Sequence, residues 1–405
     1  MKTTAKTPSG RDKDQFHYTY NTEQYNLLAE SGISVGYGTS FKITSPEQRI
    51  FVTYTEAGSA AAQASISRGA EIIAVNGVYL NNITSQQDVD TINNGLFPAS
   101  VNETHTFVIR DLNANNDRSV TLTSAETTET PVYKNQIITQ QDKNIAYLVL
   151  NTFGVATAEQ QLINAVNSLK NQTIDELILD LRYNGGGYLG ISAELGTMIA
   201  GDQAVNQVYE EMAFNNKHSV YHPVTGQPLA PILFPSAAYG FSAAEGTSLP
   251  KLNLSKVYIL STGNTASASE ALINGLRGID IEVILIGENT TGKPYGFYRQ
   301  DNCGTTYFTI QFKGQNAKGF GDYADGIIPA QTDNGTDRVR GCGVADDLSK
   351  DLGDESENML STALHHIQQG SCPTLSITNS SKPAHPLSAL RGKLIRPYPV
   401  GLIVK

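Results

Sequence analysis

The chain has 405 residues, which is enough for two or three domains of ordinary size. Hydrophobic residues make up 40% and charged residues 17%, so the composition is that of a globular protein and not of a disordered one. A formal net charge of −10 and the lack of any basic run argue against nucleic acid as a partner.

The first third of the chain predicts a compact β-rich module. Residues 1–30 are polar and end in a short helical stretch, 22–31. Segments rich in β-branched and aromatic residues then predict strands, and one segment without alternation predicts a helix. The strands are expected at 33–41, 49–54, 71–75 and 105–110, the helix at 85–94, and a hairpin loop at 112–118. Residues 121–130 are rich in Thr, Ser and Glu and are expected to form a linker.

The rest of the chain predicts an α/β core in which strands and helices alternate. Strands are expected at 145–153, 177–182, 257–261 and 283–288, and helices at 158–170, 189–200, 266–277 and 355–369. Residues 203–250 break this rhythm and are expected to form an inserted lid or cap. The predicted domains are an N-terminal segment 1–30, a β-rich domain 31–125, an α/β domain 126–372 and a Ser- and Pro-rich tail 373–405.

Three cysteines lie in the last third of the chain: Cys303, Cys342 and Cys372. None belongs to a C-x-x-C pair, which disfavours a zinc ribbon. One disulfide and one free thiol are expected, with Cys342–Cys372 and Cys303–Cys342 as the favoured pairs; three buried thiols are the alternative. No apolar stretch reaches the roughly 18 residues of a membrane span, and the first residues lack the apolar centre of a signal peptide.

The segment Thr-Ala-Ser-Ala-Ser-Glu at 265–270 lies between a predicted strand and a predicted helix. Such a position exposes the hydroxyl of Ser267 at a helix N-terminus, beside free backbone N–H groups. A lysine, Lys293, follows one strand later in Thr-Gly-Lys-Pro. A buried lysine whose pKa is depressed can act as the base for a serine. The simpler alternative is that Ser267 only caps the helix and Lys293 lies on the surface.

A third motif, Asp-Leu-Arg-Tyr-Asn-Gly-Gly-Gly at 180–187, follows a predicted buried strand and opens a helix. Its glycines could present N–H groups to an oxyanion, or could simply form a tight turn. A P-loop is excluded because no Gly-Lys-Ser/Thr follows.

Together, these motifs resemble the C-terminal processing peptidases (tail-specific proteases) of the S41 serine peptidases. The segment Ser34-Val35-Gly36-Tyr37-Gly38 also resembles the carboxylate-binding loop of a PDZ domain, and residues 67–77, Ser-Arg-Gly-Ala-Glu-Ile-Ile-Ala-Val-Asn-Gly, resemble a later PDZ segment. The resemblance covers about residues 31–370. It implies a crotonase-like ββα protease core beside a PDZ domain, an α/β (α+β) fold overall, and no cofactor.

The resemblance also implies roles for individual residues. Ser267 matches the nucleophile, Lys293 the general base, and Glu270 the acidic residue three positions after the nucleophile. Glu270 could equally be a first-turn carboxylate that interacts with the helix dipole. The oxyanion donors would be the N–H of Ala268 and that of Gly186 or Gly187. Three further residues would brace the site without reacting: Asp180, Arg182 and Asn184.

The chain departs from the family in two ways that concern the site. Many members have Gln four residues after the lysine, where this chain has Phe297, so Lys293 must be positioned by other means. An extra residue also separates the serine from the lysine. The helical N-terminal region common in the family is almost missing, which puts substrate gating through it in doubt.

The PDZ resemblance implies that a substrate's C-terminal tail adds a strand beside the domain, while the loop Val35-Gly36-Tyr37-Gly38 holds its carboxylate. The expected partners are therefore proteins or peptides with free C-termini. The domain would either deliver tails to the protease or gate it. The family implies the bacterial periplasm, envelope or exterior, with a signal removed before residue 1 and room for a lipid anchor on a longer precursor; the oligomeric state is left open.

Three alternatives remain from the sequence. The chain could be a PDZ-containing binding protein with a degenerate, inactive protease domain, or a crotonase-fold enzyme that acts on acyl-thioesters. A histidine could also replace the lysine as base, with His218 or His222 of the inserted region as candidates. His365 and His366 are expected on a solvated flank of the helix at 355–369.

Overall fold

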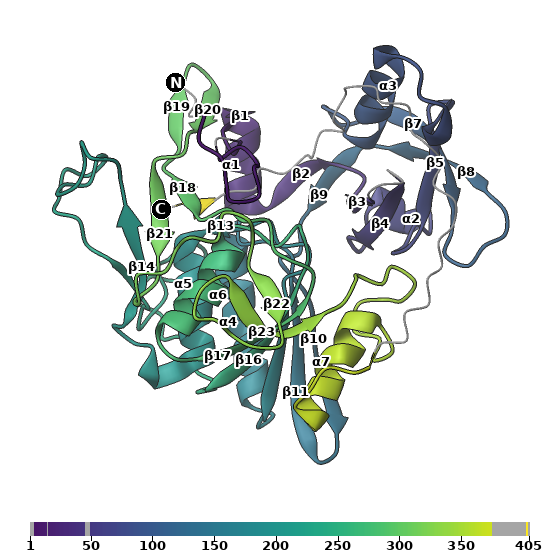
Figure 1. Cartoon of the computed structure of the whole chain (residues 1–405). Coiled ribbons are helices and arrows are strands. Elements are labelled where there is room, and N and C mark those ends of the chain that lie inside the picture. The colour runs from purple at the N-terminus through teal and green to yellow at the C-terminus, as the bar shows by residue number, and fades with distance from the viewer. Residues whose placement is uncertain (1–3, 14, 45–48, 375–401, 404–405) are drawn as a thin grey trace.

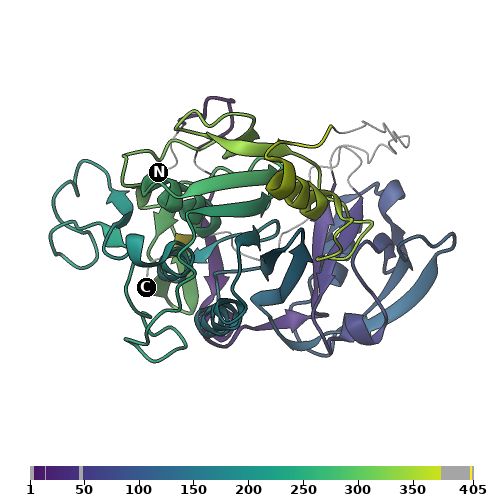
Figure 2. The same cartoon turned by 90° about the horizontal axis from the view of Figure 1, so that it is seen from below.

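The computed structural model describes residues 4–13, 15–44, 49–374 and 402–403. These form a β-rich module and an α/β module, with the β-rich module on the side of helix α7 (Asn358–Gln369) in both Figure 1 and Figure 2. The mixed α/β prediction is confirmed.

The β-rich module is built on one antiparallel sheet. Its strand order is β3 (Thr39–Ile43), β4 (Ile50–Thr55), β5 (Glu71–Val75), β7 (Thr104–Arg110) and β8 (Arg118–Thr123), with β6 (Val78–Tyr79) beside β5. Helices α2 (Ala60–Gln63) and α3 (Gln86–Leu96) accompany it. Ser85 caps α3 by accepting from the Asp88 N–H, and the Asp88 carboxylate accepts from the Ser85 N–H in return. These elements confirm the helix expected at 85–94 and the strands expected at 49–54, 71–75 and 105–110. The single strand expected at 33–41 is wrong: the chain bends at Tyr37 and Gly38, and only the part from Thr39 onward belongs to this sheet.

The predicted linker at 121–130 is wrong. Strand β8 continues to Thr123, and β9 (Ala125–Thr128) pairs with β2 (Ile33–Gly36) in a separate two-stranded ribbon. The Thr and Ser residues that suggested a loop also have high β-propensity when they lie on a half-exposed strand. The ribbon therefore closes the β-rich module where a linker was expected.

The α/β module contains a seven-stranded sheet. Its order is β10 (Val132–Gln140), β11 (Lys143–Leu150), β12 (Glu176–Asp180), β16 (Lys256–Ser261), β17 (Glu282–Gly287), β23 (Arg338–Gly343) and β22 (Ile328–Ala330). All neighbours are parallel except β10 and β11. Parallel neighbours require crossover connections, and α4 (Thr157–Lys170) and α6 (Ala268–Gly278) supply two of them.

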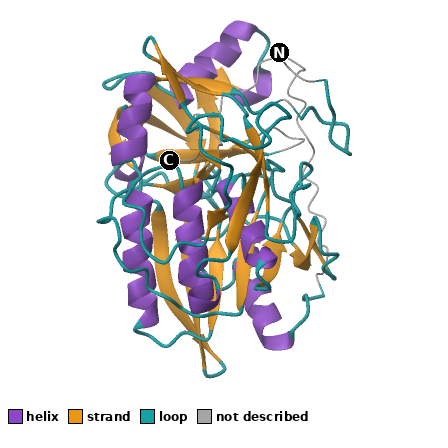
Figure 3. Cartoon of the chain, turned by 90° about the vertical axis from the view of Figure 1, so that its left-hand side faces the viewer, coloured by secondary structure: helices purple, strands orange, loops and turns teal. Residues whose placement is uncertain are grey.

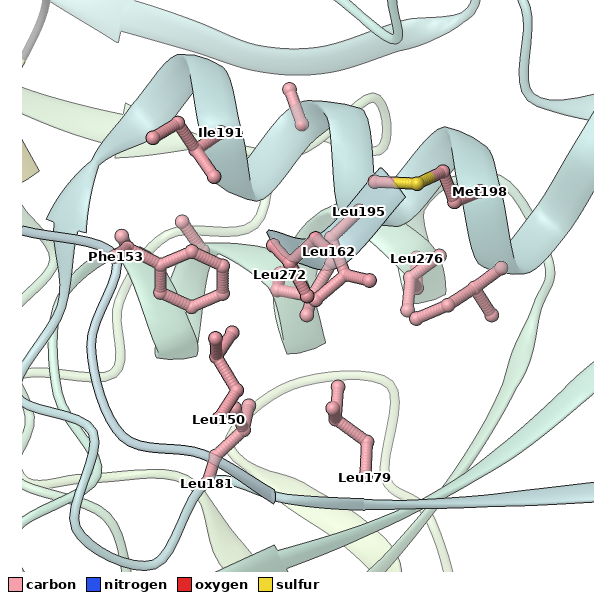
Figure 4. Packing of buried hydrophobic residues seen from close by; sticks show 14 of the residues in the cluster. Leu150, Phe153, Leu162, Leu179, Leu181, Ile191, Leu195, Met198, Leu272 and Leu276 are labelled. Carbon is pink, nitrogen blue, oxygen red and sulfur yellow. The ribbon is translucent and has the colours of Figure 1, made fainter. Parts of the chain in front are cut away.

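Helices cover both faces of this sheet. Along β11, Ala146, Leu148 and Leu150 face the core formed with α4, α5 (Leu189–Ala200) and α6, whereas the intervening residues face α7. Figure 3 shows the helices standing against the sheet, and Figure 4 shows the larger core, where Leu195, Leu272 and Leu276 of two helices meet Leu150 and Leu179 of two strands. Burying each such side chain stabilises the fold by about 1.5–3 kcal/mol, which fixes the ends of the strands that carry the site.

Two smaller sheets lie beside this core. One has the order β13 (Gly187–Tyr188), β24 (Leu402–Ile403), β18 (Tyr295–Phe297), β21 (Phe312–Gln315), β14 (Val208–Ala213) and β15 (Ile232–Leu233). The other has the order β1 (Tyr18–Asn21), β20 (Thr305–Phe308) and β19 (Gln300–Asn302). Helix α1 (Thr22–Ser31), predicted at 22–31, follows β1 directly.

The region expected to form an inserted lid, 203–250, contributes β14 and β15 to the sheet that also contains β13 and β18. No strand was predicted in this region. Its later part packs on the helices: the N–H groups of Gly240, Ser242 and Ala243 donate to the Glu159 carboxylate of α4. The tail expected to wrap the surface falls at 375–401 and 404–405, outside the described residues, apart from β24.

The disulfide prediction is confirmed for Cys342–Cys372, and Cys303 is an exposed free thiol. The placement of His366 on a solvated flank was wrong, because this side chain is buried and packs on the ring of Tyr258. Among the helices that the structure describes, none has both the length and the apolar character needed to cross a bilayer.

Candidate active site

Ser267 lies at the turn between β16 and α6, in a backbone conformation rare for a residue with a side chain (φ 61°, ψ −115°). Neighbouring segments hold this turn: the Ala266 N–H and the Ser269 hydroxyl both donate to the Asn184 carbonyl. The serine is fully buried, and its Oγ has no hydrogen-bond partner among the described residues. A strained, unpaired hydroxyl at a helix N-terminus is the geometry of a poised nucleophile.

Glu270 connects the serine turn to the lysine loop. Its carboxylate accepts from the Ser267 N–H (2.8 Å), the Gly292 N–H (2.7 Å), the Lys293 N–H (2.8 Å) and the Thr290 hydroxyl (2.5 Å). Burial raises the pKa of Glu270, and these four hydrogen bonds lower it in part. The carboxylate therefore fixes the two segments relative to each other, which is more than a helix-dipole interaction would do.

Lys293 is fully buried between aromatic rings. Its Nζ lies 4.7 Å from the ring centroid of Phe297 and 5.3 Å from that of Phe16. Burial lowers the pKa of Lys293 to about 7, although the nearby Glu270 carboxylate raises it in part. Phe297, which stands where the resemblance led us to expect Gln, is thus part of the wall around the amine. An amine with this pKa is substantially neutral at physiological pH and can accept a proton.

The glycine motif lies directly against the serine turn. A side chain on Gly186 would place its Cβ 2.7 Å from the Ser267 Cβ, and one on Gly187 would lie 2.1 Å from the Gly154 nitrogen. Both positions also have positive φ, so they require glycine. Close backbone approach, and not only a tight turn, explains these two residues.

The N–H groups of the two glycines point in different directions. The Gly186 N–H donates to the Asn184 side chain (2.9 Å). The Gly186 carbonyl accepts from the Phe153 N–H, and the Tyr188 N–H donates to the Phe153 carbonyl. Because alternate residues of a strand present their N–H and C=O groups to opposite edges, those of Gly187 face the other edge of β13.

A buried network of ion pairs surrounds Arg182, which belongs to the glycine motif. Arg182 contacts the carboxylates of Asp180, Glu357 and Asp346, and Tyr147 donates to Asp180 (2.7 Å). Each of these charges has a partner, so the network can persist in the interior. The charged groups of this network are all paired with one another, and they lie far from Ser267 in the sequence. Both facts fit a supporting role for Asp180 and Arg182.

The candidate histidines lie elsewhere. His222 contacts the Tyr298 hydroxyl through Nε2, and neither His218 nor His222 hydrogen-bonds the Ser267 Oγ, which has no partner among the described residues. Among the described residues no group of His, Cys, Asp and Glu has the arrangement of a metal site.

Only part of the predicted PDZ loop is a loop: Val35 and Gly36 lie in β2, which pairs with β9, and Tyr37 and Gly38 form the bend before β3. Tyr37 is buried and its hydroxyl donates to the Gly95 carbonyl at the end of α3 (3.0 Å), so only its backbone can serve a ligand. Gly38 has φ +72° and packs on Ser59. The following strand, β3, pairs with β4, and no other strand in the described part of the chain pairs with its second edge. A surface pocket runs from this loop to Leu96, the last residue of α3, and to Phe97 after it.

The sequence did not predict the contributions of Phe16, Asp346 and Glu357. Phe16 comes from the polar N-terminal segment, and no spacing or motif links it to the lysine. Asp346 and Glu357 follow β23 and precede α7, so only the tertiary fold brings them to Arg182.

Comparisons with known proteins agree with this geometry. Residues 144–299 match Peptidase family S41, and residues 25–95 match the PDZ domain. The carboxyl-terminal-processing protease of Picosynechococcus sp. is 25% identical over 283 residues, which are 69% of this chain and 60% of that protein. The chain thus matches less than two thirds of that relative's length.

A solved structure described as an S41 protease from Bacteroides fragilis NCTC 9343 has the same fold, with a TM-score of 0.63 at 24% identity over 88% of this chain and 87% of that one. The predicted combination of a protease-like core and a PDZ domain is confirmed. The chain therefore carries a region similar to peptidase family S41 at residues 144–299, and a region similar to a PDZ domain ahead of it at residues 25–95.

Proposed function

We propose that this chain is a serine endopeptidase that cleaves proteins near their C-termini, with Ser267 as nucleophile and Lys293 as general base. The observations that carry the proposal are a strained serine hydroxyl without a hydrogen-bond partner among the described residues and a buried lysine whose pKa is lowered to about 7. Both belong to segments held by one carboxylate, that of Glu270.

The chemistry follows acyl transfer. Neutral Lys293 accepts the Ser267 proton as Oγ attacks the scissile carbonyl, and it returns that proton to the leaving amine. Water then attacks the acyl-enzyme while Lys293 again accepts a proton. Glu270 is a positioning residue in this scheme, because its contacts are to backbone N–H groups and to Thr290.

The oxyanion of the tetrahedral intermediate would be stabilised by backbone N–H groups. Ala268 is the first residue of α6, where helical N–H groups have no intrahelical partner. Of the two glycines we propose Gly187 as the second donor, since the Gly186 N–H already donates to Asn184. Each such donor contributes roughly 3–4 kcal/mol to transition-state stabilisation.

The PDZ domain would bind the substrate's C-terminal tail. An extended tail would add to the open edge of β3, and the backbone of Val35-Gly36-Tyr37-Gly38 would receive its carboxylate. The Cys342–Cys372 disulfide supports an oxidising location such as the bacterial periplasm, envelope or exterior.

An active-site fluorophosphonate probe tests the nucleophile directly. The wild type should be labelled on Ser267, as read by peptide mass spectrometry, and should degrade an unfolded protein such as β-casein. Ser267→Ala should do neither, and Ser100→Ala, which changes an exposed serine outside the site, should still be labelled. A wild type that is neither labelled nor active would favour the inactive PDZ-containing binding protein.

A further inference from the structure

The short strand β24 lies between β13, which begins at the proposed oxyanion donor Gly187, and β18, which follows the proposed base Lys293. Strand β24 runs parallel to β13, pairing Leu402 with Gly187 and Ile403 with Tyr188. On its other side it runs parallel to β18, pairing Leu402 with Gly296 and Ile403 with Phe297. In Figure 1 it is the short yellow arrow between the labels of β13 and β18.

Both neighbours of β24 belong to the candidate active site. Strand β13 begins at Gly187, whose N–H and C=O face the edge opposite Phe153, and β24 pairs along the edge that Phe153 leaves open. Strand β18 begins at Tyr295, two residues after Lys293. The backbone of β24 therefore passes between the proposed oxyanion donor and the loop of the proposed base.

Among the described residues, strands β13 and β18 do not pair with each other, and β24 lies between them in the sheet. Strands on either side of a third lie about 10 Å apart, which is twice the spacing of neighbouring strands. Each uses the backbone groups that face the gap to pair with β24. The gap is thus a slot one strand wide that an extended peptide can fill through main-chain hydrogen bonds, with little dependence on its sequence.

We infer that the slot between β13 and β18 is the groove for the scissile segment of the substrate, and that the segment around Leu402–Ile403 of the same chain is its resident occupant. This inference rests on the proposed peptidase function. The chain's own tail then competes in cis with substrates, so that the enzyme is held back until a substrate displaces the tail.

The length of the tail makes this competition effective. Residues 375–401 connect β24 to the end of the domain, and a connection of this length can span at most roughly 90 Å. Binding across such a connection is intramolecular, with an effective concentration on the order of a millimolar at most. Peptidase substrates at a KM between about 1 μM and 1 mM would have to compete with it.

The test compares two double variants that differ in their backbone donors. Leu402→Pro/Ile403→Pro removes the N–H groups that a strand needs, whereas Leu402→Val/Ile403→Val keeps them and serves as the matched control. The proline variant should cleave β-casein at a KM roughly two- to tenfold lower than the wild type, with kcat unchanged. A synthetic peptide of residues 396–405 should inhibit the proline variant competitively.

Equal kinetics for the proline variant, the valine variant and the wild type would overturn the inference. So would inhibition of the wild type that disappears on dilution of the enzyme, because the tail would then come from a second copy.

Peptide binding separates this inference from the proposed function. In a Ser267→Ala background, a fluorescein-labelled peptide of residues 396–405 should bind the proline variant more tightly than the protein with an intact tail, as measured by anisotropy. Tighter peptide binding by the proline variant, with no hydrolysis of casein by the wild type or the proline variant, would contradict the peptidase proposal and still support the tail as occupant of the groove. Hydrolysis of casein together with equal peptide binding by the proline variant and by the protein with an intact tail would contradict the groove inference and still support the peptidase proposal.

Discussion

Glu270 organises the site at the scale of single residues. One buried carboxylate receives three backbone N–H groups and a hydroxyl from two segments that are separated by a full strand. A carboxylate has only acceptors, and all four neighbours are donors. An amide at this position would turn an N–H group toward at least one of these donors.

Glu270→Gln should therefore lower both stability and activity. We expect a loss of roughly 2–4 kcal/mol in the free energy of unfolding, because a buried donor is left unpaired, and a kcat lower by at least about tenfold. Urea unfolding and casein hydrolysis measure the two effects. Glu159→Gln is the matched control, since Glu159 is a buried acid that also receives backbone N–H groups, but on α4. Equal loss of kcat in both variants would contradict the positioning role of Glu270.

Much of this site could be predicted from the order of residues, and part of it could not. Ser267, Lys293 and the glycines stand in local motifs whose chemistry is visible before any fold is known. The aromatic wall of Lys293 is different: Phe297 was noticed only as a departure from the family, and Phe16 lies in a segment without a motif. Contacts between residues so distant in the chain depend on tertiary packing, which residue spacing does not encode.

At the scale of elements, a strong hydrophobic periodicity predicted helices and strands well, whereas amino-acid composition alone did not distinguish loops from strands. The helices α1 and α5 begin and end at the predicted residues, because each has a clear pattern and a stop signal such as Gly32 or Gly201. Residues 121–130 were misread because Thr and Ser suit both loops and strands. Strand β14 was missed since its alternation is interrupted by two adjacent acids, Glu210 and Glu211.

The buried carboxyl of Glu210 on β14 makes the stability of the folded protein depend on pH. Burial raises the pKa of this carboxyl to about 8, from 4.5 for an exposed glutamate, and its Oε1 has no partner among the described residues. The folded state thus keeps a proton that the unfolded state loses. Stability is full below pH 4.5 and falls as pH rises toward 8, by up to roughly 5 kcal/mol.

Glu210→Gln should remove this dependence. The melting temperature of the variant should match that of the wild type near pH 4.5 and exceed it by several degrees at pH 8.5, as measured by differential scanning calorimetry. Glu211→Gln, at the exposed neighbouring position, should change neither value. A wild type whose stability does not fall between pH 5 and 8 relative to Glu210→Gln would contradict the buried, protonated state.

At the scale of the whole molecule, ion pairs join the PDZ domain to the peptidase core. Arg68 of the PDZ domain contacts Asp346 (2.9 Å), which also contacts Arg182 beneath the glycine motif. Burial raises the pKa of Asp346, but the guanidinium groups of Arg182 and Arg68 outweigh this and hold it well below its usual range. The sequence predicted both domains but not this junction, because no local pattern pairs residues from different domains.

The Cys342–Cys372 disulfide ties strand β23 to the chain that follows α7. It closes a loop across a sequence separation of 30 residues, for which chain entropy gives a stabilisation of roughly 3–4 kcal/mol. The double variant Cys342→Ser/Cys372→Ser should therefore unfold at a clearly lower urea concentration. Cys303→Ser, which changes only the exposed thiol, should unfold with the wild type. Coincident transitions for all three proteins would contradict a structural role for this bond.

The pH dependence of kcat/KM tests the central claim, that a lysine of lowered pKa activates Ser267, most directly. For the wild type the rate should rise as pH increases through about 7, where Lys293 loses its proton, and then level off. Lys293→Ala should lose roughly a thousandfold or more of this activity at every pH, while circular dichroism shows it folded. A folded Lys293→Ala variant that keeps the wild-type rate and the same rise through pH 7 would contradict the account and assign the base to another residue.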